Sequence, residues 1–300
     1  MVYIRSVFVS ISCLVFLAGC AGGGGGGGGS ACSTTICGDF GTEYSAQAGL
    51  ALISAASINN AGYTGSGIKI AVLDTGIDSS HAEFSGKTIS GTNFGGGSNG
   101  VGTDGSGHGT HVASTIAGTR DGAGMRGVAY DATLYDYKIG DNSGTLAGAG
   151  TDTLDAAIYN QHVTDNIQVS NNSWGYNTDK ANSLSESTLR SVRPNTIVAM
   201  RAAQQNGTVF VFSAGNDGDD QSNLYAGLPY RITELANEWL NVVAVDSNLK
   251  ETQYTNQCGV TKDFCVTAPG GGDDTSADGI YAAQADGTYL RMSGTSMAAP

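Results

Sequence analysis

The sequence predicts an α/β fold in which a doubly wound parallel sheet carries helices on both faces. Short apolar runs, rich in β-branched and aromatic residues, alternate along the chain with longer segments of helical pattern. Such runs are typical of strands that are buried on both faces. The order strand, helix, strand is typical of parallel sheets. The chain has 300 residues, of which 40% are hydrophobic, so a sizeable core can be buried.

The elements of this domain follow from the pattern in order. Residues 41–60 are expected to add one or two helical turns against the domain. Pro194 suits the first turn of a helix, and Gly207 suits a helix end. Strands are expected at 68–73, 133–139, 167–170, 208–212 and 242–245, and helices at 108–117, 153–164 and 194–205.

The first twenty residues are expected to be a targeting segment. Arg5 and the amino terminus precede an apolar stretch that is too short to span a bilayer but fits a signal peptide. The segment ends in LAGC, which resembles the bacterial lipobox, in which the cysteine, here Cys20, is lipidated. An ordinary secretory signal with a chance cysteine is the alternative. Residues 21–40, with eight consecutive glycines, form a flexible tether, so the folded domain is expected at 41–300.

Charge and cysteine content narrow the possible functions. The formal charge of −13 repels phosphate backbones, so no nucleic-acid partner is expected. Besides Cys13 and Cys20, four cysteines remain, and this even number in an exported chain indicates two disulfides. Three pairings are possible, and the one closest in sequence joins neighbouring cysteines. Zinc is disfavoured because no histidine lies near and CxxC spacing is lacking. These four cysteines are Cys32, Cys37, Cys258 and Cys265.

Three expected strands end in polar or glycine-bearing segments. Because ligands bind beyond the carboxyl ends of the strands in an open α/β sheet, these segments are expected to share one rim and to form a site. The segments are Asp74, then Ser173-Trp174-Gly175, and then Ser213-Ala214-Gly215-Asn216.

Asp74 and His108 are the expected acid–base pair of that site. A carboxylate at the end of a buried strand needs a partner, although a solvated turn aspartate is the alternative, and we expect that role for Asp78. His108 opens a helix within GSGHGTHVA, where the glycines allow other backbone to come close. Attack by a serine hydroxyl on an amide needs a base such as histidine, and the base needs a carboxylate that orients it.

The other three histidines are expected to have no catalytic role. His162 is interpreted as a solvated helix residue. His81 and His111 could bind a metal together with His108, but their spacing differs from the HExxH pattern. No metal site and no catalytic cofactor are therefore expected.

Ser296 and Asn216 supply the remaining chemical groups. Ser296 lies in SGTSMAAP, where a turn of small residues before a helix would place its hydroxyl at a helix N-terminus. Asn216 can donate from its side-chain amide to an oxyanion. Taken singly, Ser296 could be an ordinary helix N-cap and Asn216 a turn residue in left-handed conformation.

Together these motifs resemble the subtilase family of serine peptidases from about Thr64 to Pro300. VLDTGID, GHGTHVA and GTSMAAP occur in the family's order Asp, His, Ser. The resemblance implies that Asp74 orients, His108 acts as base and acid, Ser296 is the nucleophile and Asn216 is the oxyanion donor. It further implies that Ser173–Gly175 and Ser213–Gly215 bind an extended substrate by strand addition, with Trp174 able to wall a side-chain pocket.

The resemblance also implies where the protein is located in the cell and what it binds. The lipobox, tether and subtilase-type domain together resemble the lipoprotein and autotransporter-type subtilases of Gram-negative bacteria, which implies export and a lipid anchor at the outer membrane or cell surface, or release from it. Protein or peptide substrates and a monomeric enzyme are expected. Structural calcium is common in the family, and the candidate loops are 217–220 and 272–274, although solvated acidic turns are the alternative for both.

The sequence departs from the family pattern after Ser296. Family members continue through a long buried helix, and the sequence printed above reaches only Pro300, so the expectation is an incomplete domain with a frayed Ser296 and poor activity. Two alternatives to an enzyme of this type stay open. One is a catalytically silent surface lipoprotein on a subtilase fold. The other is a carboxyl-type serine peptidase, which His108 and Asn216 argue against.

Overall fold

A parallel seven-stranded sheet organises the protein. The computed structural model describes residues 41–300 except 96–99, 142, 147, 176–177 and 274–277, and the expected signal, tether, Cys20, Cys32 and Cys37 lie outside the described residues. The strand order is β2-β3-β1-β4-β5-β6-β7, and every neighbouring pair is parallel. The strands are β1 (Lys69–Asp74), β2 (Ser90–Asn93), β3 (Thr133–Lys138), β4 (Val169–Asn172), β5 (Val209–Ser213), β6 (Trp239–Val245) and β7 (Cys265–Pro269).

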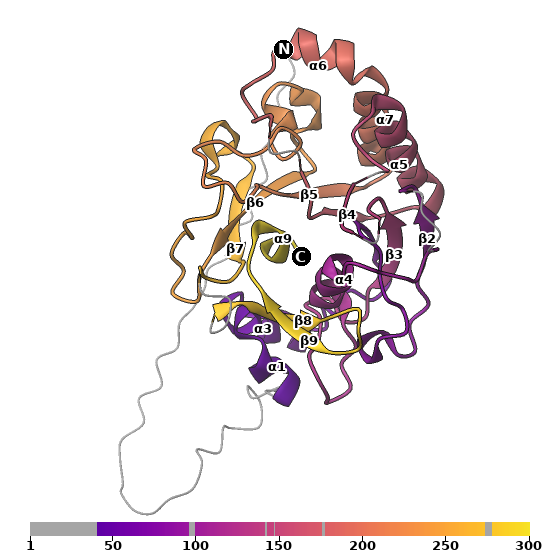
Figure 1. Ribbon diagram of the computed structural model, residues 1–300, viewed down its shortest axis with the longest axis vertical. Coiled ribbons are helices and arrows are strands. Elements are labelled where there is room, and N and C mark those ends of the chain that lie inside the picture. The colour runs from indigo at the N-terminus through magenta and orange to yellow at the C-terminus, as the bar shows by residue number, and fades with distance from the viewer. Residues whose placement is uncertain (1–40, 96–99, 142, 147, 176–177, 274–277) are drawn as a thin grey trace, which may run out of the picture. The chain divides into compact units, whose positions relative to one another are not determined.

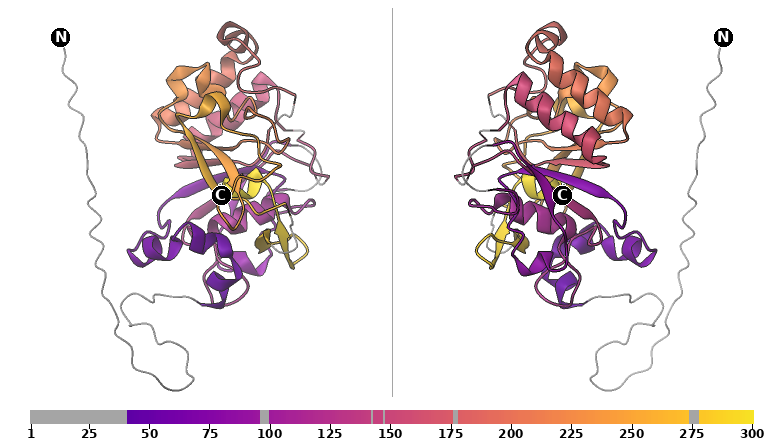
Figure 2. Two further views of the ribbon diagram at one scale, coloured as in Figure 1. Left: turned by 90° about the vertical axis from the view of Figure 1, so that its left-hand side faces the viewer. Right: turned by 90° about the vertical axis from the view of Figure 1, so that its right-hand side faces the viewer.

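Helices cover both faces of this sheet, as expected. In Figure 1, α5 (Asp152–Asp165), α6 (Glu186–Val192) and α7 (Pro194–Gln205) lie above the sheet. Below it lie α4 (His108–Ala117) and the short α9 (Thr295–Ala298). The side views of Figure 2 show the same two layers of helices with the strands between them. The middle of strand β1 is continuously apolar because alternate residues enter separate cores: Ala71 and Leu73 face one, Ile70 and Val72 the other.

Smaller elements complete the domain. Three short helices, α1 (Thr42–Ala46), α2 (Ala48–Leu52) and α3 (Ala55–Asn60), replace the one or two turns expected at 41–60. The antiparallel pair β8 (Ile280–Ala283) and β9 (Tyr289–Met292) runs below α4 and leads into α9. Short 3-10 helices lie at Ala82–Phe84, Leu228–Tyr230, Thr233–Leu235 and Gly259–Thr261.

The predicted helix at 108–117 and the one at 194–205 are confirmed at both ends, and the other predicted elements differ from the structure by one to three residues at one or both ends. His162 was misinterpreted. It is fully buried in α5, where Nδ1 donates to the Ile158 carbonyl (2.9 Å) and Nε2 accepts from Ser170 Oγ (2.8 Å). Burial lowers its pKa to about 4, so the side chain is a neutral part of the core.

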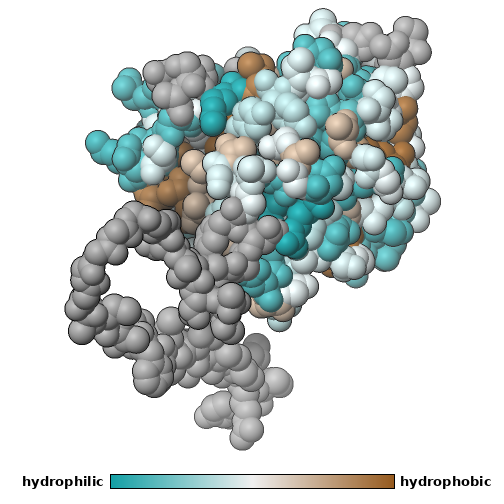
Figure 3. Space-filling model, turned by 90° about the horizontal axis from the view of Figure 1, so that it is seen from below, coloured by the Kyte–Doolittle hydropathy of each residue, from teal (hydrophilic) through white to brown (hydrophobic). Residues whose placement is uncertain are grey.

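The face of the protein that Figure 3 shows is mainly hydrophilic. The face in Figure 3 shows small, separated hydrophobic patches among polar residues. Within the described ranges, no helix combines the length and the apolar character needed to cross a bilayer.

Candidate active site

Asp74 and His108 are hydrogen-bonded at the carboxyl end of β1. Asp74 is the last residue of that strand and is 3% exposed. Its Oδ1 lies 2.7 Å from His108 Nδ1 and also accepts a hydrogen bond from Thr75 N at 2.7 Å. The buried carboxylate thus has the partner that its position required. The bond to Nδ1 leaves Nε2 of the ring as the atom that can accept a proton.

Glycines allow the histidine to come this close. Gly107 precedes the first helical residue with φ +87°, a conformation that favours glycine. At Gly109, a Cβ atom would lie 2.1 Å from the Gly76 carbonyl oxygen and 3.1 Å from the Asp74 Cβ. The start of α4 therefore packs directly against the backbone that follows β1.

The electrostatic surroundings favour a protonated His108. Burial by itself would lower the pKa of the imidazole, but the charge of Asp74, the hydrogen bond to it and the charge of Asp104 outweigh burial and raise the pKa. The side chain is 30% exposed, so one edge of the ring stays accessible. A base that stabilises its own protonated form suits proton transfer.

Ser296 lies in the first turn of α9 and is only 9% exposed. Its Oγ donates to the Ser173 carbonyl (3.0 Å), and Ser173 Oγ donates back to the Ser296 carbonyl (2.9 Å). The nucleophile is therefore held beside the end of β4. Transfer of its proton to His108 requires the hydroxyl to turn away from Ser173.

Asn216 follows β5 and contacts the residue before the nucleophile. Its Oδ1 accepts hydrogen bonds from Thr295 N (2.8 Å) and Thr295 Oγ1 (2.9 Å). The Nδ2 group faces Gly294, where a Cβ would lie 3.4 Å away. Because the oxygen is occupied, the amide is oriented with its two N–H donors available to an oxyanion, and neither donates to a residue of the part of the chain that the structure describes.

The two expected substrate-binding segments flank a common side chain. A Cβ at Gly175 would lie 2.7 Å from Asn223 Nδ2, and a Cβ at Gly215 would lie 2.6 Å from the same atom. Asn223 is 3% exposed, and its backbone N donates to the Ala214 carbonyl (2.8 Å). The carboxamide thus lies between the backbones of 173–175 and 213–215.

Trp174 does not wall a pocket between these segments. Its indole is 7% exposed and belongs to the core cluster on the α5 and α7 side, with the Phe212 and Tyr225 rings 6.2 and 5.2 Å away. Its Nε1 donates to Asn172 Oδ1 at 3.2 Å. The direction of the side chain reverses between Ser173 and Trp174, so the serine faces the site and the indole faces the core.

Sequence reasoning missed three residues of the site: Asp104, Asn171 and Asn223. Asp104 precedes the histidine motif by a few residues and accepts hydrogen bonds from its backbone. Asn171 Nδ2 donates to Ser173 Oγ at 3.0 Å. Asp104 lies three residues before the N-cap residue Gly107 but accepts a hydrogen bond from Thr110 N in the first turn of α4, so the usual N-cap position does not reveal it. Nothing local marks Asn223, whose contacts are made to distant segments, and the bond of Asn171 to Ser173 depends on side-chain directions at the end of β4 that the sequence does not reveal.

His81 and His111 have structural contacts instead of metal contacts. His111 is fully buried, its Nε2 donates to the Ile280 carbonyl (3.0 Å), and burial lowers its pKa to about 4. His81 accepts from Glu83 N through Nδ1 and reaches the Thr288 carbonyl through Nε2. Both rings attach the β8–β9 hairpin to the rest of the domain.

The acidic loop at 217–220 does not fit a calcium ion. Lys180 Nζ lies 2.9 Å from Asp217 Oδ2 and is also paired with Asp219, so a cation of the chain already contacts both carboxylates. Among the residues that the structure describes, no group of three or more His, Cys, Asp or Glu side chains is arranged to hold a metal. In the second candidate loop, Asp274 lies outside the described residues.

A largely apolar cavity of about 290 Å³ opens behind the nucleophile helix. It lies between α2, β6, β7 and β8, and Met297 to Pro300 form part of its wall. The Asp74–His108 pair and Asn216 do not line it. The cavity therefore lies apart from the reacting groups.

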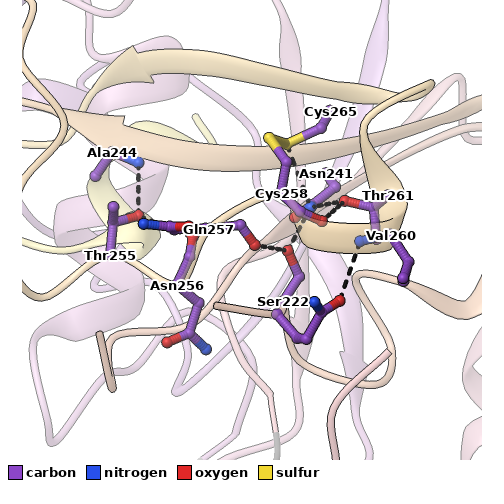
Figure 4. The surroundings of a disulfide bond; sticks show 11 residues. Ser222, Asn241, Ala244, Thr255, Asn256, Gln257, Cys258, Val260, Thr261 and Cys265 are labelled. Atoms are coloured by element: carbon purple, nitrogen blue, oxygen red, sulfur yellow. Dashed lines mark hydrogen bonds between the residues drawn. A yellow bond between two sulfur atoms is a disulfide. The ribbon is translucent and has the colours of Figure 1, made fainter. Parts of the chain in front are cut away.

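Cys258 and Cys265 form a disulfide. Figure 4 shows it beside Asn241, whose Nδ2 donates to Ser222 Oγ and Thr261 Oγ1, both at 2.6 Å. This confirms one bridge of the pairing that joins neighbouring cysteines. It closes the loop that links the 3-10 helix Gly259–Thr261 to edge strand β7.

An acid–base pair at the carboxyl rim of a parallel sheet, with a serine in the first turn of a helix that packs against the histidine's helix, is typical of the site of a serine hydrolase. Residues 65–300 match the model of the subtilase family, and the chain belongs to that family. The chain is 31% identical to subtilisin DY of Bacillus licheniformis over 252 residues, which cover 84% of this chain and 80% of that protein. It is also 31% identical to subtilisin E of Bacillus subtilis over 252 residues, but spans only 58% of that relative's length.

Solved structures agree with this assignment. A cold adapted subtilisin-like serine proteinase is 27% identical and superposes with a TM-score of 0.58, covering 79% of this chain and 73% of that one. The prenylagaramide maturation protease PagA is 26% identical with a TM-score of 0.60, covering 78% of this chain and 71% of that one. The predicted fold class is thereby confirmed.

Proposed function

We propose that the protein is a serine endopeptidase that hydrolyses peptide bonds of proteins through an acyl-enzyme. The observation that carries the proposal is the 2.7 Å bond between Asp74 Oδ1 and His108 Nδ1 at the start of α4, the helix against which α9 with its buried Ser296 packs. Family membership and the subtilisins among its relatives support the reaction class.

Each step uses a group that the site provides. His108 Nε2 takes the proton of Ser296 Oγ as the oxygen attacks the scissile carbonyl carbon. The imidazolium, stabilised by Asp74, then donates this proton to the leaving amine, and the C–N bond breaks. Water attacks the acyl-enzyme with His108 again as base, and the acid product leaves with Ser296 restored.

The oxyanion of the tetrahedral intermediates is expected to accept from Asn216 Nδ2 and from backbone N–H groups at the start of α9. The backbone on either side of the site, at 173–175 and 213–215, is expected to pair with an extended substrate, which places one substrate side chain near Asn223.

Covalent labelling by a fluorophosphonate tests the proposal, because the reagent reacts with activated serines. The wild-type full-length protein is expected to be labelled, and Ser296→Ala is expected to lose labelling. Ser293→Ala is the matched control: its hydroxyl lies three residues earlier, is buried and has no hydrogen-bond partner among the described residues. An unlabelled wild type that is shown to be folded would instead favour the catalytically silent lipoprotein.

We further propose that the protein is exported and anchored by a lipid on Cys20, with the glycine tether between anchor and enzyme. The LAGC motif supports this proposal. Metabolic labelling with a fatty-acid analogue should mark the wild type and Cys13→Ser but not Cys20→Ser. Labelling that persists in Cys20→Ser would contradict lipidation at this cysteine.

A further inference from the structure

Asp104 organises the turn from which the catalytic histidine begins. It is 8% exposed and precedes α4 by a few residues. Oδ1 accepts from Ser106 N (3.0 Å) and Gly107 N (2.9 Å), and Oδ2 accepts from Thr110 N (2.9 Å) and Thr110 Oγ1 (2.8 Å). The carboxylate therefore occupies donors on both sides of His108 along the chain.

A fifth hydrogen bond joins the Asp104 carboxylate to Thr75, the residue that follows Asp74. Thr75 Oγ1 donates to Asp104 Oδ1 (2.9 Å) and accepts from Gly109 N (3.0 Å). The backbone N of Thr75 donates to Asp74 Oδ1 at 2.7 Å. One continuous set of hydrogen bonds thus runs from Asp74 through Thr75 to Asp104.

We propose that Asp104 is a positioning residue for the reaction proposed above, because its carboxylate holds Asp74 and His108 at bonding distance and adds a second negative charge near the imidazole. The inference rests on the proposed serine peptidase activity. It assigns a role to a residue that touches neither the nucleophile nor the oxyanion donor. Carboxylate acceptors of several N–H and O–H donors make strong, charge-assisted bonds, which suits a rigid support.

The charge of Asp104 acts on His108 together with that of other groups. Asp74 and Asp104 both raise the pKa of His108, and His111, which is neutral, faces it within α4. On its other side, Asp104 faces buried Asp136, whose pKa burial raises to about 7, next to Lys138. Replacing Asp104 by a neutral isostere should therefore lower the pKa of His108.

The test compares Asp104→Asn with wild-type full-length protein in the pH dependence of inactivation by a fluorophosphonate, which reports the chemical step. In the plot of inactivation rate against pH, Asp104→Asn is expected to shift the acid limb, where protonation of His108 lowers the rate, to lower pH by about half a unit. The maximal rate of inactivation is expected to fall about 10- to 100-fold. Asp78→Asn is the control: among the described residues the side chain of this half-buried aspartate bonds only to Ser80, and its backbone N, which donates to Thr110 Oγ1, is unchanged in the variant.

A structural role alone predicts a different result. Asp104→Asn would then lower the Tm or the yield but leave the acid limb where it is in the wild type, and this outcome overturns the proposal. Equal shifts in Asp104→Asn and Asp78→Asn would also overturn it. A wild type that the reagent does not inactivate would refute the proposed function itself, which keeps the two failures distinct.

Thr75 provides the test if Asp104→Asn does not fold. Thr75→Val keeps the size of the side chain but removes the bond to Asp104, and it should lower the inactivation rate at least 10-fold. Thr75→Ser keeps the hydroxyl and should restore most of the rate. Equal rates in Thr75→Val and the wild type would overturn the proposal.

Discussion

Ser296 and Ser173 exchange hydrogen bonds, each donating its hydroxyl to the other's main-chain carbonyl. The exchange links the nucleophile helix to the end of β4, although the two residues are 123 positions apart. Asn171 extends the link by donating to Ser173 Oγ. The nucleophile is thus held by the same segment that is expected to pair with substrate.

Ser173→Ala should weaken both the fold and the reaction. It leaves the Ser296 carbonyl and the Asn171 amide without a partner in the interior, which costs about 1–3 kcal/mol. We expect kcat/KM to fall about 10-fold because the nucleophile loses a support. Thermal unfolding and peptide hydrolysis measure the two effects, with exposed Ser187→Ala as control. Wild-type Tm and kcat in folded Ser173→Ala would contradict this view of the link.

Asn216→Asp should reduce kcat and leave KM nearly unchanged. The aspartate keeps an oxygen that accepts from Thr295 but loses the N–H donors and places a negative charge beside the oxyanion. The expected loss is at least about 10²–10³-fold, a magnitude taken from the equivalent donor in subtilisin, a relative. Steady-state kinetics on a peptide substrate measure it, and Asn182→Asp at an exposed position is the control. A rise in KM alone would assign Asn216 to substrate binding.

Glu83→Gln should flatten the dependence of stability on pH. Burial raises the pKa of Glu83 to about 7, against its usual 4.5, while Met125 N and Tyr289 OH donate to it. Between these values the folded state keeps a proton that the unfolded state releases, so stability falls as pH rises, by about 3 kcal/mol at most.

Other buried groups shape the same curve, so the difference between variants is the quantity to measure. Asp136, with a pKa of about 7, acts in the same direction as Glu83. The pKa values of His111 and His162, lowered to about 4, act oppositely, because stability is lost as pH falls from 6.5 to 4. Urea unfolding at several pH values should give a smaller fall for Glu83→Gln than for the exposed control Glu251→Gln. Identical curves would show that Glu83 is ionised in the fold.

Replacing Cys258 and Cys265 by serine should lower the free energy of unfolding by about 2–3 kcal/mol. The bridge closes a short loop, and its loss returns conformational freedom to the unfolded chain. For a domain of this size, we expect the Tm to fall by about 5–10 °C in calorimetry. A reductant should lower the wild-type Tm to that of the double serine variant. If the wild type and the double variant have the same Tm without reductant, the disulfide contributes nothing to stability.

The strands and helices that could be predicted are those whose packing produces a recognisable pattern in their own segment of the sequence. Strand β1 was recognisable because burial on both faces of the sheet makes its central residues continuously apolar. Helix α4 was recognisable because glycines flank its first residue. Strand β2, with sequence SGTN, escaped prediction because it has one neighbour in the sheet and no fully buried side chain. Edge strand β7 is likewise partly exposed.

Side-chain direction and distant partners could not be predicted in the same way. Asp74, His108 and Ser296 lie in distinctive motifs, so each was identified from its own segment. The burial of His162 depends on Ser170, which belongs to the next strand. The inward direction of Trp174 depends on where β4 ends, and that boundary lies two residues beyond the predicted one.

The distances along the chain between partners in the site determine the order in which it can assemble. The Asp74–His108 bond spans 34 positions, whereas Asn216 meets Thr295 across 79 and Ser173 meets Ser296 across 123. During synthesis the acid–base pair can form long before the nucleophile leaves the ribosome. A nascent chain therefore holds a base without a nucleophile, and it cannot cut itself or its neighbours until the segment around Ser296 has docked.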